Sequence, residues 1–273
     1  MVHILLSTYN GGKYIKEQLD SILAQTCKDW HLFIRDDGSN DNTIEIIRHY
    51  AKAYYDRITY IEDQIGRGAK DAYAWLLEHY ACSDYTAFAD QDDVWMPDKL
   101  SVALETMREA ERQYGNIPLA VHTDLQVVDE NLDEISPSFW HYSNINPQWI
   151  NTNPHYLAIC NTATGCTMLI NRNAVDATLP FKNEAYMHDA WIALKIVVSG
   201  GRLIAVNKPT IKYRQHGDNT LGAEKYKFTL KNIKHKIWLA QRSYNQGKDV
   251  VFGSVLSFIF WKTVYFVRLH FTN

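Results

Sequence analysis

Short apolar runs alternate with amphipathic stretches along about the first hundred residues of the chain. The runs are rich in β-branched and aromatic side chains, which is typical of buried strands, and they cover 2–6, 30–34, 58–61 and 85–88. The stretches between them place apolar residues three and four positions apart, which predicts helices over 14–24, 44–50 and 69–80. This alternation predicts an α/β fold in which a mostly parallel central sheet carries helices on both faces.

The pattern continues less regularly after residue 90. A helix is expected over 96–114, with Pro97 in its first turn, and a strand over 119–128. Later elements are expected as strands over 167–170, 202–206 and 210–213, and as a helix over 187–199. The sheet therefore extends well beyond the regular first half of the chain.

Residues 129–163 have no clear period and contain three of the seven prolines. They predict a long irregular segment or a mobile lid. Four aromatic residues lie in this segment: Trp140, Tyr142, Trp149 and Tyr156. They would either stack on a ligand or anchor the segment on the core, and the second interpretation is favoured by ordinary aromatic usage.

Residues 223–273 differ from the rest in composition, and we expect them to form a helical, basic and aromatic-rich C-terminal extension. Seven Lys or Arg and no acidic residue lie between Lys225 and Lys248, and a mostly apolar stretch interrupted by Lys262 follows. Two interpretations remain open for 225–271. The segment would lie on an anionic membrane surface, or it would pack as a helical hairpin on the domain or on a second subunit in a dimer.

Composition excludes some classes of protein. At 273 residues and 46% hydrophobic, the chain can bury one large core or two smaller ones. A net charge of −3 gives no overall basic field, so nucleic acid is not an expected partner. The four cysteines lack Cys-x-x-Cys spacing and the chain begins with a strand pattern, so we expect reduced thiols and a cytoplasmic protein. Cys166 would lie near any bound ligand.

Polar loops follow the first, second and fourth predicted strands, at 7–12, 36–41 and 90–93. Ligands of open α/β sheets bind beyond the carboxyl ends of the strands, so these loops are expected to border one crevice. The first strand is followed by neither a Gly-x-Gly-x-x-Gly motif nor a phosphate-binding P-loop motif, which argues against a dinucleotide cofactor and a P-loop nucleotide site.

The last of these loops, Asp90-Gln91-Asp92-Asp93, places three carboxylates at a strand end. Such crowding is costly without a positive partner, and oxygen ligands favour Mg²⁺ or Mn²⁺ over zinc. A solvated acidic turn before the next helix is the alternative.

Four ordered motifs carry a resemblance to a known family: 7–11, 36–39, 89–93 and 188–189. Their order over about the first 220 residues resembles glycosyltransferase family 2, whose members are inverting enzymes with the Rossmann-like GT-A fold. The sequences 89–95 and 213–219 are similar to rhamnosyltransferase-like members from bacterial polysaccharide pathways. The resemblance implies a nucleotide-sugar-binding half at 1–128, an acceptor-binding half at 129–222, and the extension at 223–273.

The same resemblance implies the reaction. A sugar would pass from a nucleoside diphosphate donor, with dTDP-L-rhamnose expected, to a glycan or lipid-linked acceptor of cell-surface polysaccharide, at the inner face of the membrane. The alternatives are a UDP-hexose or UDP-N-acetylhexosamine transferase of the same fold. From another class they are a sugar-nucleotide pyrophosphorylase or a non-catalytic nucleotide-binding protein.

The resemblance also implies which residues bind the donor. Thr8, Tyr9 and Asn10 would border the nucleobase, and Asp37 would accept a hydrogen bond from a uracil or thymine N3–H. One of Asp36 and Asp37 is expected to form only a turn. Three further residues would contact the ribose or the diphosphate: Asp90, Gln91 and Arg214.

The metal ligands and the base are implied in the same way. Asp92 would be the principal ligand of Mg²⁺ or Mn²⁺, His216 would complete the shell, and Asp93 would help through water. Asp189, at a helix start, would be the catalytic base, although the same position suits a helix N-cap. Auxiliary roles are expected for His188, which stands where an acidic residue is common in the family, and for Trp191.

Overall fold

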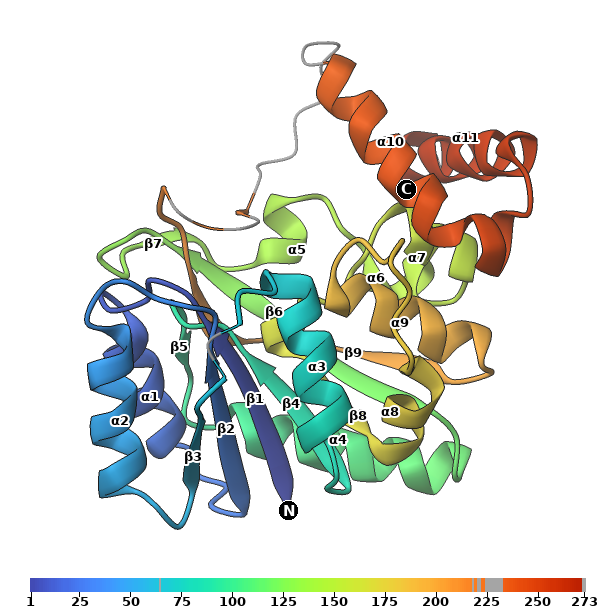
Figure 1. The fold of residues 1–273 in the computed structure, drawn as a ribbon. Helices are drawn as coiled ribbons and strands as arrows, with labels where there is room; N and C mark the ends of the chain where they lie inside the picture. The colour runs from blue at the N-terminus through green and yellow to red at the C-terminus, as the bar shows by residue number, and fades with distance from the viewer. Residues whose placement is uncertain (64, 218, 220–221, 224–232, 272–273) are drawn as a thin grey trace.

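The computed structural model describes residues 1–63, 65–217, 219, 222–223 and 233–271. One mixed sheet of nine strands organises them (Figure 1). Its strands are β1 (Val2–Thr8), β2 (Trp30–Asp36), β3 (Ile58–Ile61), β4 (Tyr85–Ala89), β5 (Val94–Trp95), β6 (Leu119–Val128), β7 (Glu134–Ser136), β8 (Leu169–Asn171) and β9 (Arg202–Arg214). They follow the order β3-β2-β1-β4-β8-β6-β9-β5, with β7 paired to β6.

The first four strands form the parallel part of the sheet that the sequence predicts. β1 lies between β2 and β4, and it pairs with both in parallel register. The chain adds strands on one side of β1 as far as β3 and then crosses to the other side for β4. The strand order therefore reverses beside β1, and open α/β sheets bind ligands at the carboxyl ends of strands at such a point.

Helices cover both faces of the sheet, as predicted (Figure 1). One apolar cluster joins the strands to α1 (Ile15–Leu23), α2 (Thr43–Ala53) and α4 (Lys99–Tyr114). A second cluster lies on the opposite face and joins them to α3 (Ala69–Tyr80), α8 (Arg172–Thr178) and α9 (His188–Val198). Because successive side chains of a strand point to opposite faces, Ile4 and Leu6 enter the first cluster and Leu5 enters the second.

Beyond β4 the sheet is mixed, and two expectations need correction. The two strands expected at 202–206 and 210–213 are one strand, β9, whose register against β6 shifts around Asp124. Val94 and Trp95, to which no element was assigned from the sequence, form β5 antiparallel to β9. Helix α4 begins at Lys99, so Pro97 precedes its N-cap Asp98. Helix α8 and the short 3₁₀ helix η1 (Gly165–Thr167) lacked a clear apolar period and were not expected.

Residues 129–163 are not the irregular segment that the sequence predicted. They form β7, α5 (Phe139–Tyr142), α6 (Pro147–Ile150) and α7 (Pro154–Ile159). Each short helix begins at a polar side chain that accepts a backbone N–H of its first turn, namely Ser138, Asn146 and Asn153. Trp140 and Tyr156 are buried, which supports the interpretation that the aromatic residues anchor the segment.

The C-terminal helix pair consists of α10 (Ile233–Gly247) and α11 (Val255–Phe271), joined by the π-helical turn η2 (Lys248–Phe252). It projects from the upper right of the molecule in Figure 1, above α6 and α7. Over the described residues no single helix is long and apolar enough to cross a membrane. The two segments pass that test only together, and they are bent by 106°.

Candidate active site

The loop after β1 is fastened to the loop after β4 by one side chain, that of Gln91. Its Oε1 accepts hydrogen bonds from Thr8 Oγ1 at 2.5 Å and from the Tyr9 N–H at 2.8 Å. Its Nε2 donates to the Tyr9 carbonyl at 3.0 Å. Three of the residues predicted to bind a nucleotide sugar therefore lie together at the strand reversal.

The loop after β2 joins the same group through Asn10. The Asn10 N–H donates to Ser39 Oγ at 2.8 Å, and Asn10 Oδ1 accepts from the Asn40 N–H at 2.9 Å. Asn10 has a φ of 47°, in the left-handed region where asparagine is enriched. The three strand-end loops thus converge, as the sequence predicts.

Asp36 and Asp37 have different partners. Asp36 is buried and accepts the N–H groups of Gly38 and Ser39, so it forms the turn. Asp37 accepts hydrogen bonds from Arg35 Nη1 at 2.5 Å and from the Arg67 and Gly68 N–H groups, each at 2.8 Å. Burial alone would raise the pKa of Asp37, but these hydrogen bonds hold that pKa below its ordinary value. Asp37 is therefore an ionised hydrogen-bond acceptor in the loop after β2.

The carboxylates after β4 lie at different depths. Tyr73 Oη donates to Asp90 Oδ1 at 3.1 Å, and burial followed by the charge of Asp92 raises the pKa of Asp90 to about 7. Asp93 is fully buried and accepts the Arg214 N–H at 3.2 Å. Burial, together with Asp92 and Asp90, raises the pKa of Asp93 well above its ordinary value. The buried Cys166 thiol lies within 4.8 Å of both the Asp90 and Asp93 carboxylates.

Asp92 and His216, which are predicted to be two ligands of one metal, are in contact. His216 Nε2 lies 2.7 Å from Asp92 Oδ2, and Asn219 Nδ2 donates to the same oxygen at 3.3 Å. Neighbouring ligand atoms on an octahedral Mg²⁺ lie about 3 Å apart, since each bond is about 2.1 Å long. The pair is therefore close to the spacing that such a cation needs, and both side chains remain slightly exposed.

Arg214 holds the loop after β4 in place. Its guanidinium donates to the Asp92 carbonyl at 2.8 Å, to the Glu130 carbonyl at 2.6 Å, and to the Glu17 carboxylate. The side chain is 3% exposed and lies over the Tyr14 ring. In this structure Arg214 therefore positions Asp92, and its contact with a phosphate of the donor stays a prediction.

Asp189 lies at the second position of α9, whose N-cap is Met187, so the N-cap interpretation of Asp189 is wrong. Its carboxylate accepts the Gly165 N–H at 3.1 Å and the Ala190 N–H at 2.6 Å. Burial outweighs these hydrogen bonds and raises the pKa of Asp189 to about 6. The Asp189 charge also contributes to the raised pKa of Asp90, so the two carboxylates belong to one site.

His188 is buried between Tyr73, on which its ring stacks at 4.1 Å, and Gly165. A Cβ at position 165 would lie 2.5 Å from His188 Nε2, so only glycine fits there. Burial lowers the pKa of His188 to about 3, which keeps the ring neutral and argues against its taking a proton itself. The His188 ring therefore packs on Tyr73, whose Oη donates a hydrogen bond to Asp90.

Trp191 does not border the crevice, and its expected auxiliary role is corrected. The side chain is 1% exposed, and its indole N–H donates to the Thr178 carbonyl at 3.1 Å. Its ring packs beside Phe181 between α8 and α9. Trp191 is therefore a buried core residue between α8 and α9.

Several residues of the site were given no role from the sequence: Tyr73 and Lys99 lie outside the motifs, and Asn219 is the last residue of the 213–219 motif. Tyr73 and Asn219 bond Asp90 and Asp92, and Arg35 bonds Asp37. Lys99 is fully buried, with Nζ 3.8 Å from the Trp95 ring centre, and burial lowers its pKa to about 8 while Cys166 and Asp93 oppose that shift. Arg35 could have been noticed as a charged residue that ends an apolar run directly before two acidic residues.

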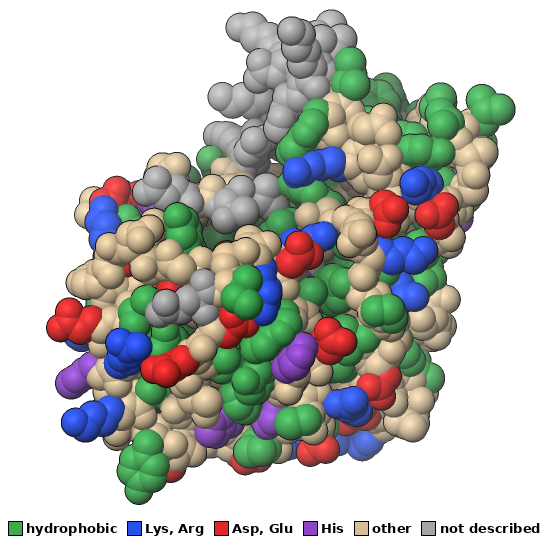
Figure 2. Space-filling model, in the orientation of Figure 1, with side chains coloured by type: hydrophobic (Ala, Val, Ile, Leu, Met, Phe, Trp, Pro, Cys, Tyr) green, Lys and Arg blue, Asp and Glu red, His purple; other side chains and the backbone are tan. Residues whose placement is uncertain are grey.

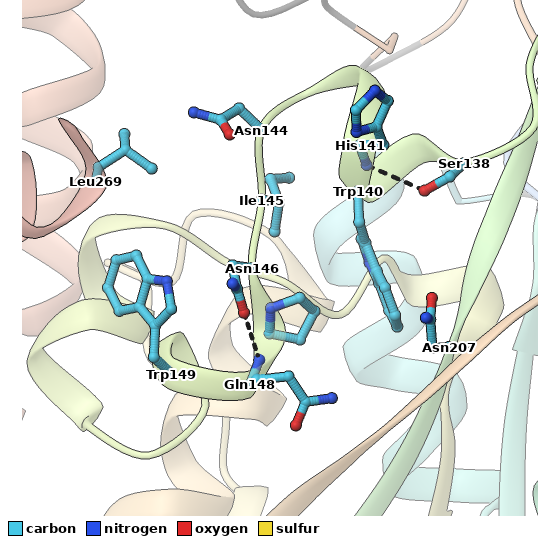
Figure 3. Close-up of a pocket in the computed structure, with 11 residues that line it drawn as sticks. Ser138, Trp140, His141, Asn144, Ile145, Asn146, Gln148, Trp149, Asn207 and Leu269 are labelled. Carbon is cyan, nitrogen blue, oxygen red and sulfur yellow. Dashed lines mark hydrogen bonds between the residues drawn. The ribbon is translucent and has the colours of Figure 1, made fainter. Parts of the chain in front are cut away.

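A pocket of about 300 Å³ lies in the predicted acceptor half (Figure 3). Residues of α5, α6 and the turn between them line it, with Asn207 of β9 and Leu269 of α11. Trp140 and Trp149 provide its aromatic walls, and its other polar side chains are uncharged apart from the titratable His141. Buried Asp124 holds α5 against β6, because it accepts the Trp140 N–H at 3.1 Å and the Ser138 hydroxyl.

Sequence comparisons relate most of the chain to glycosyltransferases. The sequence model described as glycosyl transferase family 2 matches residues 3–176. The chain is 28% identical to the dTDP-rhamnosyl transferase RfbG of Shigella flexneri, over 94% of this chain and 93% of that protein. It is 26% identical to the UDP-Glc:alpha-D-GlcNAc-diphosphoundecaprenol beta-1,3-glucosyltransferase WfgD of Escherichia coli, over 83% of this chain and 81% of that protein.

Solved structures support the fold. TarS 1-349 of S. aureus in complex with UDP superposes with a TM-score of 0.63 at 16% identity, covering 100% of this chain and 72% of that chain. The mannosyltransferase PcManGT from Pyrobaculum calidifontis in complex with GDP-Man and Mn²⁺ gives 0.59 at 18% identity, covering 99% and 81%. The predicted GT-A fold with a C-terminal helical part, and the resemblance to rhamnosyltransferase-like proteins, are confirmed.

Proposed function

Because the chain belongs to glycosyl transferase family 2, we propose that it is a metal-dependent, inverting enzyme that moves one sugar from a nucleoside diphosphate donor to a glycan or lipid-linked acceptor. One observation supports this above the others. The pair Asp92 and His216, at 2.7 Å, lies beside Asp90 at the strand reversal, and Asp189 interacts with Asp90 across the same site.

The loops after β1 and β2 are proposed to bind the nucleotide sugar. Thr8, Tyr9 and Asn10 border its nucleobase, and Asp37 accepts a hydrogen bond from the nucleobase N3–H, which uracil and thymine share. The ionised state of Asp37 makes that hydrogen bond strong. The rhamnosyl relative favours dTDP-L-rhamnose as the donor, and the glucosyl relative keeps a UDP-hexose or UDP-N-acetylhexosamine as the alternative.

Asp92 and His216 would hold Mg²⁺ or Mn²⁺, with Asp93 assisting through water and Asp90 beside the ribose. Once bound, the cation would offset the negative charge that develops on the departing nucleoside diphosphate. Mn²⁺ is present in one of the structures of similar fold. The contribution of Arg214 is to fix the backbone of Asp92 through a 2.8 Å hydrogen bond.

Asp189 is proposed as the base. It takes the proton of an acceptor hydroxyl while that oxygen bonds to the anomeric carbon, and the bond from this carbon to the diphosphate oxygen breaks on the opposite side. A pKa of about 6 leaves Asp189 ionised at neutral pH and still basic enough to share the proton. Neutral His188 supports this arrangement by packing against Tyr73.

The pocket in the acceptor half supports a neutral glycan as acceptor. Tryptophan side chains present apolar faces to sugar rings, and uncharged amides can bond hydroxyl groups in either direction. Asn144, Gln148 and Asn207 provide such amides around Trp140. Their type and placement favour a sugar over a charged ligand.

The proposal is tested with purified protein, a panel of UDP-, dTDP- and GDP-sugars, and Mg²⁺ or Mn²⁺. A dTDP- or UDP-sugar should raise the melting temperature in a metal-dependent manner and should be slowly hydrolysed. Asp92→Asn should lose the metal-dependent part of the shift, while Asp133→Asn, at an exposed position, should keep it.

The alternatives give different results in the same assay. A pyrophosphorylase would release diphosphate from a nucleoside triphosphate and a sugar phosphate, and a binding protein would be stabilised by nucleotide without hydrolysis. Absence of both binding and hydrolysis across the whole panel would overturn the proposed function.

A further inference from the structure

Charge is divided unequally between the C-terminal segment and the rest of the chain. Residues 225–271 contain nine Lys or Arg and a single acidic residue, Asp249. The rest of the chain contains 19 basic and 30 acidic residues. The net charge of −3 therefore conceals a strongly basic segment joined to an acidic catalytic part, a distribution that favours contact of the segment with an anionic surface.

Helix α11 carries a continuous stripe of exposed apolar side chains. Its members recur at the spacing of one helix face, and we call them the outer apolar face: Val255, Leu256, Ile259, Phe260, Phe266, Val267 and Phe271. Leu256 and Phe271 are 79% and 74% exposed. Figure 2 shows hydrophobic side chains gathered over this upper right part of the molecule. Large contiguous apolar patches on a protein surface mark interaction sites.

The opposite side of α11 is already used for packing. Trp261 stacks on His155 at 4.1 Å, Tyr265 lies 5.3 Å from Trp149, and Phe258 is buried against Phe252. These contacts fix α11 on α6 and α7, so the outer apolar face cannot turn inward. A helix that is apolar on its outer side as well as its inner side needs a second apolar environment.

Helix α10 adds features of a membrane interface. Ile237, Trp238 and Leu239 are exposed, and Arg242 lies 3.7 Å from the Trp238 ring centre. Tryptophan beside a cationic side chain is favoured at the level of lipid headgroups. The 106° bend between the two helices and the absence of a single spanning helix over the described residues favour a position in the interface plane.

We infer that the outer apolar face of α11, with the basic residues of the described helix pair 233–271, docks on an anionic lipid surface. A second copy of the chain fits less well, because a two-fold contact through this face would bring two strongly basic segments together. The inference goes beyond the proposed function and does not depend on it, since it rests on the C-terminal helix pair alone.

The test is sedimentation of the full chain with vesicles of phosphatidylcholine alone or mixed with phosphatidylglycerol. The protein should bind the mixed vesicles, and salt should weaken binding because exposed charges are screened. The double variant Leu256→Glu with Phe260→Glu should bind at least about tenfold more weakly, since it removes two large apolar side chains from the contact.

Tyr55→Glu is the matched control, because Tyr55 is 81% exposed against 79% for Leu256 and lies just after α2, which Figure 1 shows on the side of the molecule away from α10 and α11. The control should bind vesicles like the wild type, and all variants should keep the wild-type melting temperature, which shows that they fold. Equal binding of the double variant to mixed vesicles would overturn the inference. So would a dimeric wild type that the double variant converts to a monomer. Loss of donor binding with vesicle binding retained would count only against the proposed function.

Discussion

Asp189 and Asp92 have different tasks in the proposed reaction, and their surroundings differ accordingly. A base must be ionised at working pH and still accept a proton, and burial places the pKa of Asp189 at about 6. Asp92, the proposed metal ligand, lies 2.7 Å from His216 Nε2 and accepts a hydrogen bond from Asn219 Nδ2. The site separates the two carboxylates by environment.

The role of Asp189 predicts a pH profile. Wild-type turnover should fall as the pH drops below about 6, because the carboxyl becomes protonated. Asp189→Asn should lower kcat by roughly 100- to 10,000-fold, leave donor binding unchanged, and lose this acid limb from any residual activity. The measurement is kcat against pH with saturating donor. Near-normal turnover in Asp189→Asn would rule out the base assignment.

The same carboxyl predicts a pH-dependent change in stability. Its pKa in the folded protein, about 6, lies above the ordinary value of 3.8, so the folded state binds the proton more tightly than the unfolded state. The free energy of unfolding should therefore fall as pH rises from about 4 to 6. The Asp189→Asn variant should not show this fall, because an asparagine side chain does not ionise. The melting temperature of Asp189→Asn minus that of the wild type should therefore be larger at about pH 8 than at about pH 4. An equal difference at both pH values would contradict this.

At the scale of single residues, the sequence predicted roles for side chains that lie in the ordered family motifs. Asp90, Asp92, Asp189 and His216 were found because strand ends and motif order place them together. Tyr73 was not, since nothing in the sequence around α3 shows that its hydroxyl reaches Asp90, 17 positions later. Residues that support a site through the fold leave no local pattern.

At the scale of elements, segment 129–163 shows which local signals carry information. Asn146-Pro147 and Asn153-Pro154 each combine a capping side chain with proline at the first helical turn. That signal could have located α6 and α7, but the prolines were interpreted as loop formers. The pairing of β5 with β9 could not have been predicted, because it joins residues over a hundred positions apart and β5 has only two residues.

Asp124 is predicted to hold α5 and hence the wall of the acceptor pocket. Asp124→Ala leaves the Trp140 N–H and the Ser138 hydroxyl without their acceptor, so the free energy of unfolding should fall by about 2 kcal/mol. Acceptor KM should rise while donor binding stays unchanged. Urea denaturation measures the first effect, and Asp133→Ala, at an exposed position, should change it by less than about 0.5 kcal/mol. A stable Asp124→Ala protein with unchanged acceptor KM would contradict this role.

At the scale of the whole molecule, the sequence predicted the layered fold but not its mixed half. The parallel strands follow from the strand and helix alternation, and two apolar clusters cover the two faces of the sheet. Strand β8 lies between β4 and β6 and is antiparallel to both. This position depends on tertiary contacts, which the local pattern of apolar residues does not predict. The C-terminal helices were foreseen as helical, and their packing on α7 through Trp261 required the structure.

Strand β9 has a consequence for how this protein is made. The family match ends at residue 176, yet β9 and the turn after it supply the groups that hold Asp92: Arg214, His216 and Asn219. Since the ribosome releases the chain from its N-terminus, the loops after β1, β2 and β4 exist before the strand that fixes them. A nascent chain can build the parallel sheet early, but its proposed donor site is among the last parts to be assembled during synthesis.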